Sequence, residues 1–341
     1  MKKTIVSIIT MILLVAFLSG CSMDPFGCSG NTVTLATGDK APWHNGLGYE
    51  RVEYDIAKND YRQKNGNEDF VTVAEGKYVT ELIEVKTLGE YPVFPLDKLN
   101  LTADAGAGFT VLRTSSTLTY NNKSEFNGKT DTVTVDLLFY SSDLYPVYLH
   151  KESTCESDPT NSYSLATDYV NLTNKGDIDG EAFDVPVTKD KVYDSELMFF
   201  VIRALSSLGR SGTGSLSVYS AADSALQGKS VVFPMAFQCQ NQYANVVTDK
   251  DDKFVKNCFQ RLPEKNNDGY YLLPSIITLL NINATNRGAP ILLSYSAEPF
   301  VMLGASMSNV LTSFIKQSYD IETATLAFTS EYTISNYSIQ K

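Results

Sequence analysis

Alternation of apolar and polar residues is the feature of this 341-residue sequence that most restricts its fold. Val52, Tyr54 and Ile56 alternate with charged residues, and residues 132–139 repeat the same period of two. Successive side chains of a β-strand point to opposite faces of a sheet, so this period is typical of strands that bury one face. The sequence therefore predicts a protein built mainly from half-buried β-strands.

Further strand signals run through most of the chain. They cover residues 77–87, 109–120, 145–150, 215–219, 231–237, 291–295 and 326–334. Turn signals such as Asn127-Gly128 and Asp268-Gly269 lie between them. Many strands joined by short turns favour antiparallel pairing. We therefore expect a mainly β fold of the α+β type, with one large antiparallel sheet and a few covering helices.

Two segments interrupt the strand pattern. Asp194 is a suitable N-cap for the run from Leu197 to Leu208, which is apolar nearly all round and predicts a buried helix. Arg203 lies inside this run, so we expect it to contact an acidic side chain or carbonyl oxygens. A second helix is predicted from about Ser306 to Lys316, with its apolar residues on one side.

The N-terminus has the organisation of an export signal. Lys2 and Lys3 precede an apolar stretch from Ile5 to Leu18, which is too short for a spanning helix of about 20 residues. The following Leu-Ser-Gly-Cys, residues 18–21, resembles a bacterial lipobox, in which the cysteine thiol takes a diacylglycerol. An ordinary secretory peptide with a chance cysteine is the alternative. We expect lipidation at Cys21, with the protein anchored on the extracytoplasmic face of a membrane in a bacterial cell envelope.

This signal sets the expected organisation of the chain. Residues 1–20 form the lipoprotein signal peptide, residues 21–31 a tether, and residues 32–341 a β-rich extracytoplasmic domain. The stretch Glu156 to Asp190 is more polar and contains Pro159, Gly176 and Gly180. It either subdivides the domain near residues 156–190 or is a long excursion within one large sheet, and we favour the second interpretation.

Cysteine usage agrees with an extracytoplasmic location. Four cysteines remain besides Cys21, and an even number outside the cytoplasm suggests two disulfides. These candidates are Cys28, Cys155, Cys239 and Cys258. Cys239 with Cys258 would close a small loop, which leaves Cys28 with Cys155; four free thiols are the alternative. The sequence contains no Cys-x-x-Cys and two histidines, so we predict no metal site.

The search for catalytic motifs is negative. His44 and His150 have no nucleophile nearby in sequence, and residues 313–316 match Ser-x-x-Lys without an accompanying Lys-Thr-Gly. Residues 106–108 lack the later glycine of a phosphate-binding loop. Residues 177–181 resemble part of a calcium loop, but the ligand spacing fails. We therefore predict no catalytic residue, no cofactor and no enzymatic activity.

The net charge and the aromatic content of the chain indicate which classes of partner it can bind. The chain carries 39 acidic and 28 basic residues, a net charge of −11, so it lacks the basic face that nucleic acids require. It also contains 20 tyrosines and 17 phenylalanines. Such aromatic side chains line a cleft for an apolar or sugar-like ligand, or fill a large β core.

Four segments carry a resemblance to a known group of proteins. They are Tyr49 to Ala57, Gly76-Lys77-Tyr78, the run Tyr193 to Leu205, and Gly288-Ala289-Pro290-Ile291. Their order resembles a group of uncharacterised bacterial exported β-sheet lipoproteins. These are distantly similar to the lipoprotein-carrier superfamily, whose curved antiparallel half-barrel shelters acyl chains under short helices. The resemblance implies a half-barrel-like sheet and assigns no binding residue.

Together these observations lead to one expected function and one alternative. We expect a membrane-anchored extracytoplasmic lipoprotein that binds an apolar or amphiphilic, lipid-like ligand in a curved β-sheet. The alternative is a cell-surface adhesion or envelope scaffold module without enzymatic activity. The membrane is the expected partner through the lipid anchor, and the sequence identifies no protein partner.

Overall fold

The computed structural model describes eleven parts of the chain. They are residues 48–62, 70–106, 108–188, 191–206, 212–244, 267, 271–281, 285–286, 289–301, 309–320 and 325–340. The signal peptide, Cys21, the tether and His44 lie outside these ranges, so the predictions made for them stay predictions. Among the described residues, every helix is too short or too polar to span a bilayer.

The described residues form one sixteen-stranded sheet and a few short helices. The strands are β1 (Tyr49–Asp60), β2 (Val71–Glu84), β3 (Phe109–Tyr120), β4 (Thr130–Tyr140), β5 (Pro146–Cys155), β6 (Tyr163–Asp168), β7 (Thr173–Ile178), β8 (Glu181–Pro186), β9 (Tyr193–Asp194), β10 (Gly212–Tyr219), β11 (Val232–Ala244), β12 (Tyr271–Asn281), β13 (Thr285–Asn286), β14 (Ala289–Val301), β15 (Asn309–Asp320) and β16 (Thr325–Gln340). The helices are η2 (Leu88–Glu90), η3 (Pro159–Asn161), η4 (Ser195–Leu197), α2 (Met198–Ser206) and α3 (Ala221–Gln227).

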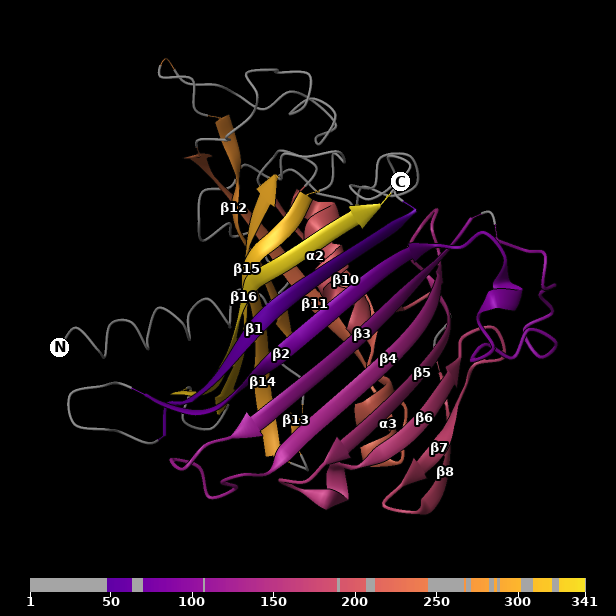
Figure 1. Ribbon diagram of the computed structural model, residues 1–341, viewed down its shortest axis with the longest axis horizontal. Coiled ribbons are helices and arrows are strands. Elements are labelled where there is room, and N and C mark those ends of the chain that lie inside the picture. Colours follow the sequence, from indigo (N-terminus) through magenta and orange to yellow (C-terminus); the bar gives the residue numbers. More distant parts are fainter. Residues whose placement is uncertain are drawn as a thin grey trace.

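The sheet is a meander that begins in its own middle. β1 lies between β2 and β16; the chain runs outward from β1 to β8 and returns from the opposite end through β10 to β16. All described pairs are antiparallel except the short pairing of β9 with β10. The sheet curves, so that β1–β8 form one layer with later strands behind it (Figure 1). This confirms the predicted mainly β fold with a large curved antiparallel sheet.

The helix predicted after Asp194 is confirmed. The Asp194 carboxylate accepts a hydrogen bond from the backbone N–H of Glu196 at 2.7 Å, and η4 and then α2 follow. α2 lies inside the curve of the sheet, where it contacts β12, β14 and β15 on one side (Figure 1). On the other side its side chains pack against the strands from β1 to β6.

The second predicted helix, Ser306 to Lys316, is wrong. Residues 309–320 form β15, which pairs with β14 on one edge and β16 on the other. The β-branched residues Val310, Thr312 and Ile315 suit a pleated strand better than a helix. Pairing on both edges outweighs the weak helical periodicity of this segment.

The polar stretch between Glu156 and Asp190 contributes three strands to the same sheet, β6, β7 and β8. Asp179 and Gly180, with φ angles of 51° and 81°, form the two-residue turn between paired Ile178 and Glu181. Such a turn requires a positive φ at both positions, which Asp-Gly tolerates. The segment that resembles a calcium loop is therefore a tight hairpin.

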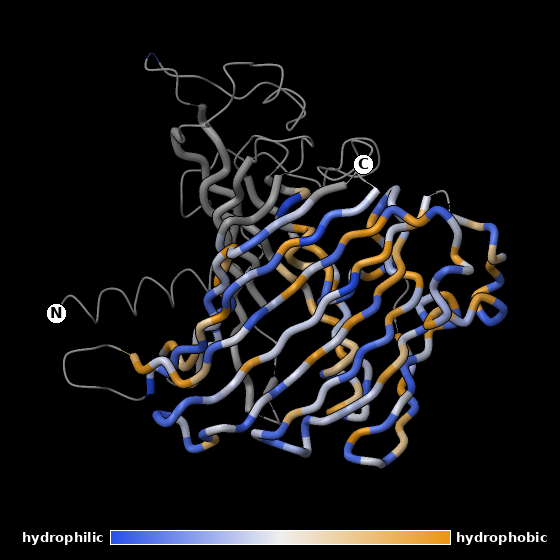
Figure 2. The backbone as a smooth tube through the Cα atoms, viewed as in Figure 1, coloured by the Kyte–Doolittle hydropathy of each residue, from blue (hydrophilic) through white to orange (hydrophobic). Residues whose placement is uncertain are grey.

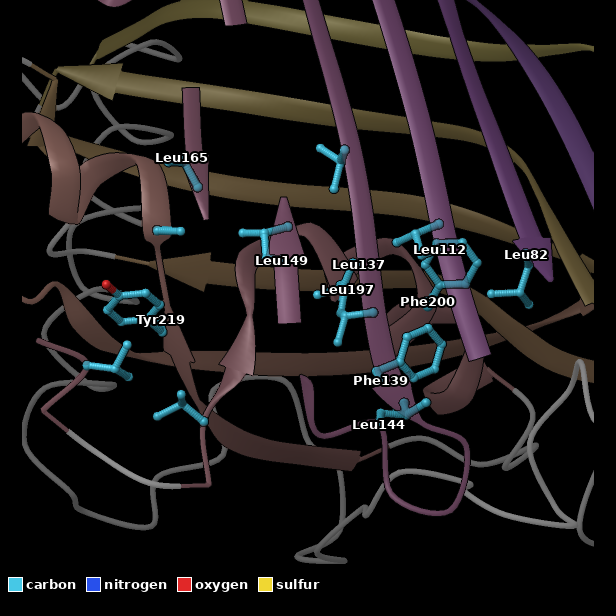
Figure 3. Close-up of a cluster of buried hydrophobic side chains, with 14 of the residues drawn as sticks. Leu82, Leu112, Leu137, Phe139, Leu144, Leu149, Leu165, Leu197, Phe200 and Tyr219 are labelled. Atoms are coloured by element: carbon cyan, nitrogen blue, oxygen red, sulfur yellow. The ribbon is translucent and has the colours of Figure 1, made fainter. Parts of the chain in front are cut away.

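Two of the three core clusters lie between α2 and the sheet, and the third packs the segment around η2 against β3, β4 and β5. Leu197 and Phe200 of the helical segment point into a cluster of leucine and phenylalanine side chains from β2 to β6 (Figure 3). A second cluster on the other side of α2 joins Met198 and Val201 to Tyr54 and Phe314. Hydropathy alternates along the strands of the front layer, as expected when one face is buried (Figure 2).

Candidate functional site

Cross-strand pairing arranges the inward-facing side chains of β1 to β7 in rows. Residues directly opposite each other on paired strands share a face of the sheet. The first row, near the start of β1, is Glu50, Leu82, Leu112, Leu137, Leu149, Thr167 and Asn174. Every member of this row is buried. The second row is Val52, Thr80, Thr114, Val135, Lys151, Leu165 and Gly176, and Lys151 and Gly176 are half-buried in it.

Burial is lower in the third and fourth rows, mainly on β3 to β7. The third row is Tyr54, Tyr78, Ser116, Val133, Ser153, Tyr163 and Ile178, and its last five members are half-buried. The fourth row is Ile56, Gly76, Leu118, Asp131 and Cys155, of which all but Ile56 are half-buried. We call the half-buried residues Ser116, Leu118, Val133, Ser153, Tyr163 and Ile178 the open concave surface.

A buried ion pair fixes the end of α2 to the first row. The Arg203 guanidinium donates to both carboxylate oxygens of Glu50, at 2.6 and 2.9 Å. The side chains of Arg203 and Glu50 are 5% and 2% exposed. The expectation that Arg203 contacts an acidic partner is thereby confirmed. Two-point contact of this kind compensates the desolvation of both charges and fixes their geometry.

A second ion pair fixes the start of the helical segment. The Lys151 ammonium of β5 donates to Glu196 at 2.7 Å. Burial raises the pKa of Glu196, but attraction by Lys151, with a further contribution from Lys316, outweighs it and holds this pKa below its usual value. The Lys151–Glu196 pair therefore stays ionised and borders the open concave surface at the second row.

Asp194 adds a buried contact beside this pair. Its carboxylate accepts a hydrogen bond from the Tyr169 hydroxyl as well as from the N–H of Glu196. Burial, and then repulsion by Glu196, raises the pKa of Asp194 to about 7. Titratable groups with shifted pKa values gather at functional sites and also in structural networks. Here the hydrogen bonds of Asp194 identify it as a contact that holds the start of the helical segment.

The cysteine and histidine candidates lie apart from these contacts. Cys155, in the fourth row, forms no disulfide with another described residue, and its sulfur lies 3.3 Å from the Ser157 hydroxyl oxygen. Cys239 lies on β11, but its side chain, like Cys28 and Cys258, is outside the description, so the disulfide pairs stay predictions. His150 lies on β5, 3.8 Å from the Glu152 carboxylate.

The Ser-x-x-Lys match is placed differently from the expectation of two polar positions on a helix. Ser313 and Lys316 both lie on β15. Residues three apart on a strand point to opposite faces. The structure therefore separates the two side chains, and the motif forms no joint site.

Sequence reasoning missed the lysines that face inward. Lys151 follows Leu149 by two residues, so it occupies the inward phase of its strand. Lys58 and Lys316 occupy the same phase behind Ile56 and Phe314. In each strand a lysine stands where the period of two calls for an apolar residue. That exception to the pattern is the sequence signal by which these lysines could have been identified.

The fold defines a mainly β protein with an internal helix and a partly open concave surface. No protein-family model matches this chain, and a search of curated proteins finds no match either. Among solved structures, the chain is similar to a β-barrel-like protein of domain of unknown function DUF1849 from Brucella abortus. That match has 8% sequence identity and a TM-score of 0.46, and it covers 86% of this chain and 99% of the other.

Proposed function

We propose that this chain is a membrane-anchored lipoprotein of the bacterial cell envelope that binds an apolar or amphiphilic ligand on its open concave surface. The role is binding without catalysis. The observation that carries the proposal is the incomplete burial of Leu118, Val133 and Ile178, although they lie on the concave face of the sheet. Covering apolar surface of this kind is favourable by about 25 cal/mol per Å².

The chemistry of the surface supports an amphiphile over a purely apolar molecule. Leucine, valine and isoleucine side chains alternate there with the hydroxyls of Ser116, Ser153 and Tyr163. Hydroxyls with apolar neighbours bind a chain that carries some polar groups. The ionised Lys151–Glu196 pair borders the same surface.

The anchor rests on the sequence of residues 2–21. We expect radiolabelled palmitate to enter the expressed protein and the protein to partition with membranes. Cys21→Ser should abolish both, while Cys155→Ser, which removes a thiol of the folded body, should leave both unchanged. Unchanged partitioning of the Cys21→Ser variant would refute the lipid anchor.

The ligand is tested on the full chain carrying Cys21→Ser, which has no lipid of its own. Native mass spectrometry of the purified protein should show an added mass, and solvent extraction should release a lipid-like molecule. Ser153→Leu, which fills part of the open concave surface, should reduce the bound fraction. A protein free of bound lipid that also fails to take up added amphiphiles would favour the adhesion or scaffold alternative.

A further inference from the structure

A fifth row continues the concave face beyond the open concave surface. In this row Lys58 of β1 pairs with Ser330 of β16, and Ser330 pairs with Lys316 of β15. On the other side, Lys58 pairs with Ala74, which pairs with Tyr120 of β3. The register thus places two lysines on either side of one serine, next to the row that contains Leu118.

Lys58 contacts one hydroxyl group and two aromatic rings. Its ammonium lies 2.9 Å from the Tyr120 hydroxyl oxygen, 5.0 Å from the centre of the Tyr120 ring and 5.5 Å from the centre of the Phe328 ring. Aromatic faces stabilise a cation without neutralising it. The Tyr120 hydroxyl also hydrogen-bonds the half-buried Asp131 carboxylate of the fourth row. Lys58 is half-buried in the inward phase of β1, so its positive charge lies on the concave side.

Lys316 adds a second positive charge to the same side. It is half-buried, and its charge contributes to the lowered pKa of Glu196 on η4, so its field reaches the interior of the curved sheet. Neighbouring strands are about 4.8 Å apart, so two positions separated by one strand are about 10 Å apart. Long lysine side chains at that separation can converge on one anionic group.

The open concave surface leads directly to these lysines. Tyr332 in the fourth row of β16 is half-buried and pairs with Ile56, and Ile56 pairs with Gly76 next to Leu118. Ile56 and Tyr332 pack in the core with Phe199 and Phe314. The link between the fifth row and the open concave surface is therefore on β3, where half-buried Leu118 precedes Tyr120 by two residues on the same face. This arrangement fits a molecule with one charged end and a long apolar part.

We propose that the ligand is an amphiphile with an anionic headgroup, a carboxylate or phosphate. Lys58 and Lys316 bind this headgroup, the Ser330 hydroxyl donates to it, and the apolar chain lies along the open concave surface. This inference rests on the proposed function and names its ligand class. Charge complementarity carries it: in a chain with a net charge of −11, the two inward positions on either side of Ser330 are both basic.

The test measures binding to the full chain carrying Cys21→Ser. The probes are sodium dodecanoate, its uncharged methyl ester, and sodium acetate as the headgroup alone, all at pH 8. The variant Lys58→Gln with Lys316→Gln should bind dodecanoate at least about tenfold more weakly, because charge-assisted hydrogen bonds are lost. Its affinity for methyl dodecanoate should be unchanged. Lys77→Gln, which removes a lysine from the convex face, should change neither affinity.

Each other outcome overturns part of the proposal. Equal dodecanoate affinity in the double variant and the parent would remove the headgroup assignment and leave ligand binding intact. Acetate binding as tight as that of dodecanoate would indicate a site for a free anion instead of an amphiphile. Failure of the parent to bind either dodecanoate or its ester would refute the proposed function and this inference together. If the double variant does not fold, each single variant should weaken dodecanoate binding about threefold.

Discussion

The two ends of the concave face are made from the same strands and differ in what covers them. In the first two rows α2 lies against the sheet, and nearly every side chain is buried. In the third and fourth rows the residues of β3 to β7 are half-buried. The alternating sequence pattern therefore produces an apolar face on the sheet. Whether part of that face becomes core or stays half-buried depends on whether the helix α2 covers it.

The dimensions of a helix explain where the boundary falls. Two residues along a strand advance about 6.8 Å, so four rows span about 20 Å. A helix with its side chains is about 10 Å across, which is enough to cover two rows. α2 has nine residues and is held at the first two rows by the Glu50–Arg203 and Lys151–Glu196 pairs. Its Phe199 also contacts Tyr78 in the third row and Tyr332 in the fourth, on β2 and β16. The third and fourth rows stay half-buried on β3 to β7, beyond the reach of the helix.

The largest expected effect comes from removing the anchor of α2. Arg203→Ala leaves Glu50 buried without its partner and should destabilise the protein by about 3–5 kcal/mol. Arg51→Ala, which removes an arginine from the convex face of the same β1, should cost about 1 kcal/mol or less. Urea unfolding of both variants measures the difference. Equal losses would mean that the covered end depends no more on its ion pair than the outer surface does.

The comparison itself is tested by two leucines of β3. Leu112 in the first row is fully buried and Leu118 in the fourth row is half-buried. Leu112→Ala should reduce the free energy of unfolding by about 2–5 kcal/mol, because it leaves a cavity under α2. Leu118→Ala should reduce it by about 1 kcal/mol, since less packing is lost. Similar values from chemical unfolding would contradict an open fourth row.

The pH dependence of the covered end should depend on Asp194. Its pKa is about 7 in the folded protein and 3.8 in the unfolded chain. A raised carboxyl pKa means that the protonated form is favoured on folding, so its contribution is fully present below pH 3.8 and is lost as pH rises through 7. Between pH 5 and 8 the parent should lose about 3 kcal/mol relative to Asp194→Asn. Asp55→Asn on the convex face should follow the parent in unfolding measured across this range.

The smallest expected change in stability comes from adding a larger side chain at the covered and the open end of the concave face. Ala204 of α2 is fully buried, so Ala204→Leu should overpack the covered end and cost about 1–3 kcal/mol. Ser153 in the third row is half-buried, and Ser153→Leu should change stability by about 0.5 kcal/mol or less. Thermal unfolding separates the two. A large loss from Ser153→Leu would show that the third row is already filled.

Local patterns predicted much of this arrangement. The strand predicted for residues 109–120 coincides with β3, and the capped helix after Asp194 is present. β6, β7 and β8 were missed, because polar side chains on both faces of these short strands hide the period of two. Within this segment, the Asp179-Gly180 pair is a sequence signal for a tight turn between two strands of a hairpin. A helix was wrongly predicted at residues 306–316 because its apolar residues recur with a helical period. Pairing of β15 with strands on both edges decided for a strand instead.

The sequence by itself determined which faces are apolar, because alternation and capping act between residues a few positions apart. The same alternation carried a signal, missed by sequence reasoning, that Lys58 and Lys151 share the inward phase of their strands. Tertiary structure alone decided that Arg203 meets Glu50, 153 residues away, and that Lys58 and Lys316 flank Ser330. The register between distant strands depends on how the whole sheet packs, and so does the position of α2 on it. No local sequence pattern encodes that packing.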